Sequence, residues 1–230
     1  MAGRKSFHEQ LAEAEARVVD ATGLVLRQLD LTLRSLETKD LALADVVISG
    51  DDAVDECYMD IERRILTLLA TQAPVASDLR LVSAMLHINI HLERSADLCT
   101  NIAKLVKLTA ELPFFSDIVQ ELVEMGRQGH RMMDQAIQAF VKRDLEMALA
   151  LPEMDESIDR LNRNLFKKVA QRFAGDEDEV EWGSRMVLVS RQLERMGDHA
   201  VDIGEQVAFM ITGEFREFTD ASEQALLPDA

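Results

Sequence analysis

Four pairs of acidic residues, each pair spaced four positions apart, are the residues in this chain best suited to chemistry. Residues four apart share one face of a helix, so the two carboxylates of a pair repel each other. Bound cations would relieve this repulsion, and oxygen ligands favour magnesium, calcium, manganese or ferric iron. The predicted metal ligands are Asp51, Asp55, Glu93, Asp97, Asp155, Asp159, Glu194 and Asp198, with Asn101 and Asp202 one turn further along as additional oxygen donors.

The acidic pairs recur because the chain contains a duplication. The segment Leu92–Asp97 returns as Leu193–Asp198, and Asp51–Asp55 matches Asp155–Asp159. The two copies are roughly 100 residues long, which indicates a duplicated domain rather than a solenoid.

Three long helices in each copy are predicted to position these pairs. Apolar residues from Leu11 to Leu36 recur every three, four or seven positions, as in a helix buried along one side. The predicted fold class is all-α, with two tandem pseudo-symmetric three-helix bundles at 1–112 and 113–215 and a flexible tail at 216–230. The first helix is expected to end near residue 37. The second, third and fourth are expected to span 40–71, 79–108 and 118–140. The fifth is expected to begin at 144, and the sixth to span 180–211. Gly50 and Pro152 fall inside the second and fifth helices, where a bend or loosened turn is expected.

The composition favours a protein that acts on neither nucleic acid nor membrane. There are 25 basic and 42 acidic side chains, and the formal net charge of −17 repels DNA, RNA and anionic lipid. The amino terminus does not read as a secretory signal, and no apolar run is long enough to span a bilayer, so we expect a cytoplasmic protein. Cys57 and Cys99 are expected to be buried, reduced thiols.

Signatures of catalysis are absent from the sequence. No histidine follows a glutamate in the Glu-x-x-His pattern of di-iron bundles, and there is no Gly-rich phosphate loop, no G-x-S-x-G and no organic cofactor motif. His87 and His91 share a helix face and form a minor zinc candidate. Two alternatives to a regulator stay open: a multinuclear metal-dependent hydrolase, and a metal-free acidic scaffold that binds a basic partner.

Four segments together resemble the PhoU family of phosphate-transport regulators. They are Gln72–Arg80, Leu92–Asp97, Leu193–Ala200 and Phe209–Glu214, and the similarity extends in order from residue 7 to residue 215. The resemblance implies two similar three-helix bundles and a protein without catalytic activity. Family members bind iron or zinc clusters through their acidic motifs in some cases, and often form homodimers.

The resemblance also implies partners. PhoU proteins link the nucleotide-binding subunit of a phosphate ABC transporter to a sensor histidine kinase, and hold the phosphate-starvation response off when phosphate is plentiful. Association with the membrane would then occur only through these partners.

Two departures from the family pattern affect the acidic motifs. Ala96 stands where the second copy has Gly197, the commoner family choice, and Asp202 stands where asparagine is usual, as at Asn101. The alanine is expected to hinder close helix approach slightly, and the aspartate adds charge to the second site. We therefore expect the two sites to differ in metal number or affinity.

Overall fold

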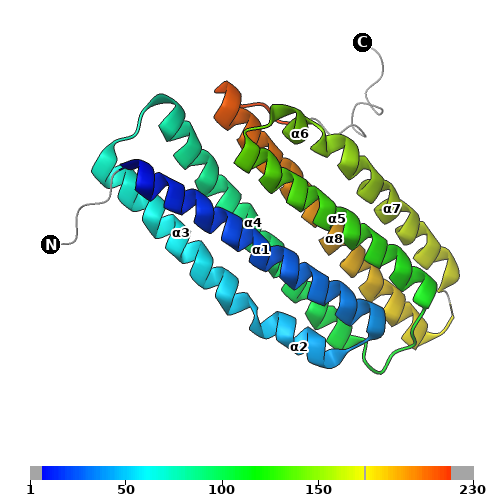
Figure 1. Ribbon diagram of the computed structural model, residues 1–230. Coiled ribbons are helices and arrows are strands. Elements are labelled where there is room, and N and C mark those ends of the chain that lie inside the picture. Colours follow the sequence, from blue (N-terminus) through cyan, green and yellow to red (C-terminus); the bar gives the residue numbers. More distant parts are fainter. Residues whose placement is uncertain (1–6, 174, 219–230) are drawn as a thin grey trace, which may run out of the picture.

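The computed structural model describes residues 7–173 and 175–218, and over these it is all-α, as predicted. The helices are α1 (Phe7–Thr38), α2 (Leu41–Ser49), α3 (Asp51–Gln72), α4 (Ala76–Leu108), α5 (Ser116–Lys142), α6 (Leu145–Leu149), α7 (Leu151–Arg172) and α8 (Glu177–Thr212). They form an elongated bundle of rods that lie side by side (Figure 1). We call α1–α4 the first half and α5–α8 the second half. Most of the predicted tail, residues 219–230, lies outside the described residues.

The six predicted helices are confirmed, and two of them are divided. Gly50 ends α2 and precedes α3, and Ala150 ends α6 and precedes α7. Pro152 lies in the first turn of α7, where its missing N–H needs no partner. The break places Asp51 at the start of α3, and the positive end of a helix stabilises a carboxylate there.

The duplication is visible in the caps as well. Asp40 accepts hydrogen bonds from the backbone of α2, and Asp144 does the same for α6. Lys39 and Arg143, the residues just before these caps, both adopt a left-handed backbone conformation with φ of 55°. Each half therefore makes the same sharp turn into its divided helix.

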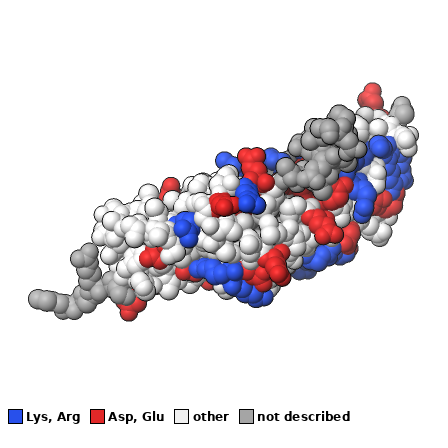
Figure 2. All heavy atoms as spheres, turned by 90° about the horizontal axis from the view of Figure 1, so that it is seen from above, with Lys and Arg blue, Asp and Glu red and all other residues white. Residues whose placement is uncertain are grey.

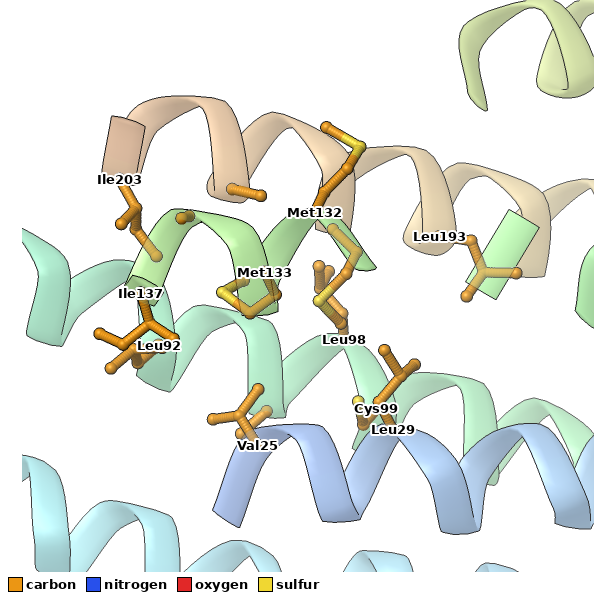
Figure 3. Close-up of a cluster of buried hydrophobic side chains, with 14 of the residues drawn as sticks. Val25, Leu29, Leu92, Leu98, Cys99, Met132, Met133, Ile137, Leu193 and Ile203 are labelled. Carbon is orange, nitrogen blue, oxygen red and sulfur yellow. The ribbon is translucent and has the colours of Figure 1, made fainter. Parts of the chain in front are cut away.

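The two halves share one hydrophobic core. α1 contacts α5, and α4 contacts α8, so the four longest helices lie against each other while α3 and α7 flank them. Figure 3 shows the centre of this core, which contains Val25 and Leu29 of α1, Leu92 of α4 and Ile137 of α5. Burial of such side chains is the main driving force of folding, so the halves are expected to stabilise each other.

The two cysteines are buried, as the sequence predicts, and the charged side chains of the surface are mixed. Cys57 and Cys99 are buried free cysteines, and burial raises the pKa of Cys99 to about 12. On the face drawn in Figure 2, Lys and Arg side chains lie beside Asp and Glu side chains. None of the described helices has the length and apolar character that crossing a membrane requires.

Candidate functional site

In the first half, the two predicted acidic pairs lie on neighbouring helices and affect each other's charge. Asp51 and Asp55 are on α3, Glu93 and Asp97 are on α4, and these helices are in contact. Desolvation raises the pKa of Asp55, and the charges of Asp51 and Asp97 raise it further. Burial likewise raises the pKa of Glu93, and the charges of Asp97 and Asp55 add to the effect. The four carboxylates therefore form one negatively charged cluster.

Among the described residues, this first-half cluster has no basic partner in direct contact. Within residues 7–173 and 175–218, no Lys or Arg forms an ion pair with any of its four carboxylates. Arg94 follows Glu93 on α4 and lowers its pKa, but this effect is smaller than the opposing effects of burial and the nearby carboxylates. A cluster of like charges without a counter-ion favours the binding of a cation.

In the second half, Gly197 of α8 lets Asp155 of α7 approach α8 closely. A Cβ built on Gly197 would lie 2.2 Å from Asp155 Oδ1, which is closer than a side chain can come. The matching residue of the first half is Ala96, whose side chain is buried. This difference supports the expectation that the two acidic sites are not identical.

Glu194 is the most perturbed carboxylate of the candidate sites. It is only 7% exposed, and its Oε2 has no hydrogen-bond partner among the described residues. Arg191 donates a hydrogen bond to Oε1. Burial, reinforced by the charges of Asp198 and Asp159, raises the pKa of Glu194 to about 7. Its buried charge is therefore disfavoured near neutral pH unless a cation stabilises it.

A pocket of about 220 Å³ opens beside the second acidic site. Four carboxylates line it, from Asp155 on α7 and from Asp198, Asp202 and Glu205 on α8. Partial desolvation raises the pKa of Asp198 and of Glu205. Asp202, the extra oxygen donor proposed from the sequence, thus lies at the second site. Asn101, its counterpart in the first half, is exposed.

The oxygen atoms of the eight predicted carboxylates do not form a compact group of metal ligands. Among the described residues, no three of the eight place one ligand atom each within 4.8 Å of one another. A different group does so: His91, His199 and Asp202. Metal binding by the eight carboxylates stays a prediction.

The histidine group was missed by the sequence reasoning. The sequence places His91 on one helix face with His87, but His87 is exposed and its Nδ1 lies 2.9 Å from the carbonyl oxygen of Ser83. His91 instead meets His199 across the interface between α4 and α8. Burial lowers the pKa of His91 to about 4, so its ring is neutral at pH 7. The only signal in the sequence was the spacing of His199 and Asp202, three positions apart on one helix face.

Comparisons with known proteins support the duplication and the fold. The PhoU domain profile matches residues 18–106 and again 122–207. The "phosphate-specific transport system accessory protein PhoU homolog" of Caulobacter vibrioides is 30% identical over 210 residues, which is 91% of each chain. The Clostridium acetobutylicum protein of the same description is 30% identical over 94% of this chain and 99% of its own.

Two crystal structures share the arrangement of helices. PhoU from Pseudomonas aeruginosa superposes with a TM-score of 0.85 and 27% identity, covering 91% of this chain and 100% of that chain. The "phosphate transport system regulatory protein PhoU" of Streptococcus pneumoniae gives a TM-score of 0.84 at 27% identity, covering 93% and 100%. Since the domain profile matches both halves and relatives align over nearly the whole length, the chain belongs to the PhoU family.

Proposed function

We propose that this protein is a non-enzymatic regulator of phosphate uptake and of the phosphate-starvation response. The observation that carries the proposal is the similarity over both halves to phosphate transport accessory and regulatory proteins. In this role the protein represses the response while phosphate is plentiful. The acidic motifs lie at matching places in the two halves, which agrees with a duplicated binding function.

The proposed partners are the nucleotide-binding subunit of a phosphate ABC transporter and a sensor histidine kinase. Both present surfaces in the cytoplasm, where we place this protein as a homodimer. The name of the Caulobacter relative, an accessory protein of a transport system, supports an interaction with a transporter. The net charge of −17 favours partner surfaces rich in lysine and arginine.

Deletion of the gene tests this regulatory role. In phosphate-rich medium, the deletion strain is expected to produce alkaline phosphatase at the level that wild-type cells reach only during starvation, because the repressing protein is gone. A plasmid copy of the wild-type gene is the control and should restore repression. Unchanged alkaline phosphatase in the deletion strain would contradict the proposal.

We further propose that the paired carboxylates bind metal ions in each half. The first-half ligands would be Asp51, Asp55, Glu93 and Asp97, and the second-half ligands Asp155, Asp159, Glu194 and Asp198. The residues present fit such a role, because within the described part of the chain the first cluster lacks a basic partner in direct contact and Glu194 has a buried oxygen without a hydrogen bond. Iron, zinc, magnesium and manganese are the candidates. A bound ion would supply positive charge between helices that otherwise repel.

The glycine of the second site provides a specific test of metal binding there. Gly197→Ala would place a methyl carbon 2.2 Å from Asp155 Oδ1, so Asp155 must turn away from α8. We expect Mn²⁺ binding at the second site to weaken by about 10-fold or more, since ligands must be held in place. The helix itself should persist, because alanine is favoured over glycine in a helix by about 1 kcal/mol.

The matched variant is Ala96→Gly in the first half, which adds no atoms beside the acidic residues. Calorimetric titration of Mn²⁺ into both variants and the wild type gives the comparison. Equal Mn²⁺ binding by Gly197→Ala and wild type would show that Asp155 is not a ligand. It would leave the regulatory role to be judged by the deletion experiment.

A further inference from the structure

Three ligand atoms from the two halves meet at the interface between α4 and α8. His91 Nδ1 lies 3.4 Å from His199 Nδ1 and 3.3 Å from Asp202 Oδ2. The third side of the triangle, from His199 Nδ1 to Asp202 Oδ2, is 3.5 Å. His91 belongs to the first half, whereas His199 and Asp202 lie on one face of α8 in the second half.

The size of this triangle matches one face of a zinc coordination tetrahedron. Zinc binds histidine nitrogen and carboxylate oxygen at roughly 2.0–2.2 Å, so two ligand atoms of a tetrahedral site are about 3.3–3.6 Å apart. The three observed separations, 3.3, 3.4 and 3.5 Å, lie within this range. A zinc ion above the triangle would therefore reach all three atoms without a change in backbone.

The Nδ1 atoms of both rings lie at this corner. His199 is 7% exposed, and its Nε2 has no hydrogen-bond partner within the described part of the chain. The polar contacts of the ring are thus made by Nδ1, with His91 and Asp202. The side chain of Asp202 is 40% exposed and lines the neighbouring pocket, so an ion and a water molecule as fourth ligand can enter from solvent.

We propose that His91, His199 and Asp202 form a zinc site that joins the two halves of the protein. Two imidazole nitrogens and one carboxylate are a donor set typical of zinc, whereas magnesium and calcium prefer oxygen alone. The site therefore differs in chemistry from the paired carboxylates. It does not depend on the proposed regulatory function, because it follows from these three side chains alone.

Zinc bound there would hold α4 against α8. The two helices already pack through apolar side chains, and the ion would add a link between residues that are far apart in the sequence. Because a ligand that binds only the folded state stabilises it, zinc is expected to raise the melting temperature.

Titration of zinc into the full chain tests the site. The protein is first freed of metal with a chelator and then saturated with Mg²⁺, which occupies oxygen-only sites. Addition of Zn²⁺ alone should then reveal a binding event in the wild type. His91→Gln is expected to lower the affinity for zinc by about 100-fold or more. This loss exceeds the one expected when only a residue that supports a ligand is removed. Co²⁺ in place of Zn²⁺ should give the strong visible absorption of a four-coordinate ion in the wild type and not in His91→Gln.

The matched control is His87→Gln, one turn earlier on α4, where the ring is exposed and lies beside Ser83. This variant should bind zinc as the wild type does and show the same rise in melting temperature. If His91→Gln does not fold, as judged by circular dichroism, Asp202→Asn replaces it in the comparison. Zinc binding that is equal in wild type and His91→Gln, or absent from the wild type, would overturn the proposal.

Discussion

Glu194→Gln is expected to stabilise the metal-free protein at pH 8 and to remove the stabilisation that metal provides. The pKa of Glu194 is about 7 in the folded protein, against an ordinary value of 4.5. A pKa raised by folding means that the charged form is disfavoured in the folded state. The penalty is absent below pH 4.5, grows as the pH rises and is complete above pH 7. Its full size is on the order of 3 kcal/mol.

Not all of this penalty is recovered by the substitution, because glutamine also loses the charge-assisted hydrogen bond from Arg191. We therefore expect a net gain in the free energy of unfolding of about 1–2 kcal/mol at pH 8. At pH 4.5 and below, the gain should vanish. Urea unfolding in the presence of a chelator, at both pH values, measures this difference.

The matched control is Glu181→Gln on the same helix. Glu181 also pairs with an arginine, Arg185, but its side chain is 49% exposed. Its substitution should change the free energy of unfolding by less than about 0.5 kcal/mol at either pH. Identical behaviour of the two variants in the chelator would show that burial of Glu194 carries no penalty.

Metal should reverse the order of stability. A ligand at 100 times its dissociation constant stabilises the folded state by about 2.7 kcal/mol. With Mn²⁺ at such a concentration, the wild type and Glu181→Gln are expected to gain stability, and Glu194→Gln is expected to gain much less. Equal Mn²⁺ stabilisation of all three proteins would remove Glu194 from the predicted ligand set.

Leu29→Ala is expected to destabilise both halves together, by about 2–5 kcal/mol. Leu29 lies on α1 and is fully buried beside Cys99 (Figure 3). Shortening it leaves a cavity in a continuous core to which both halves contribute side chains. Trp182, the only tryptophan, lies on α8 in the second half and reports unfolding there.

Urea unfolding should therefore give one transition, shifted equally in Trp182 fluorescence and in circular dichroism. The matched variant is Leu24→Ala on the same helix, where the side chain is 36% exposed and the loss should be below about 1 kcal/mol. A fluorescence transition that does not move in Leu29→Ala, while circular dichroism does, would mean that the halves unfold independently.

Much of the fold followed from local sequence signals. The apolar stripe of α1, the start of a helix near residue 40 and the end of the last helix near residue 211 depend on neighbouring residues alone, and the structure confirms each of them. Boundaries without a strong cap were less predictable. α4 begins at Ala76, earlier than the predicted start at residue 79, and no side chain caps it.

The sequence predicted those parts of the candidate sites that depend on spacing within one helix. Spacing four positions apart identifies a shared helix face, so the pairs on α3, α4, α7 and α8 could be found from the sequence. The meeting of His91 with His199 depends on how α4 lies against α8, and no spacing within one helix records it. The perturbation of Glu194 likewise depends on burial between helices.

The hydrolase alternative loses its support through the family relationship. Relatives that align over nearly the whole chain are described as accessory and regulatory proteins of phosphate transport. The same acidic residues then serve a regulator rather than a catalyst. The metal-free scaffold alternative differs from our proposal in one respect, the occupancy of the acidic sites.

Anomalous X-ray diffraction from crystals of protein purified without chelators tests the central claim, that the duplicated acidic pairs are metal sites, most directly. Our account predicts anomalous density between α3 and α4 beside Glu93 and Asp97, and between α7 and α8 beside Glu194 and Asp198. Carboxylates at both places with water and no metal, in crystals supplied with Mn²⁺, would contradict it.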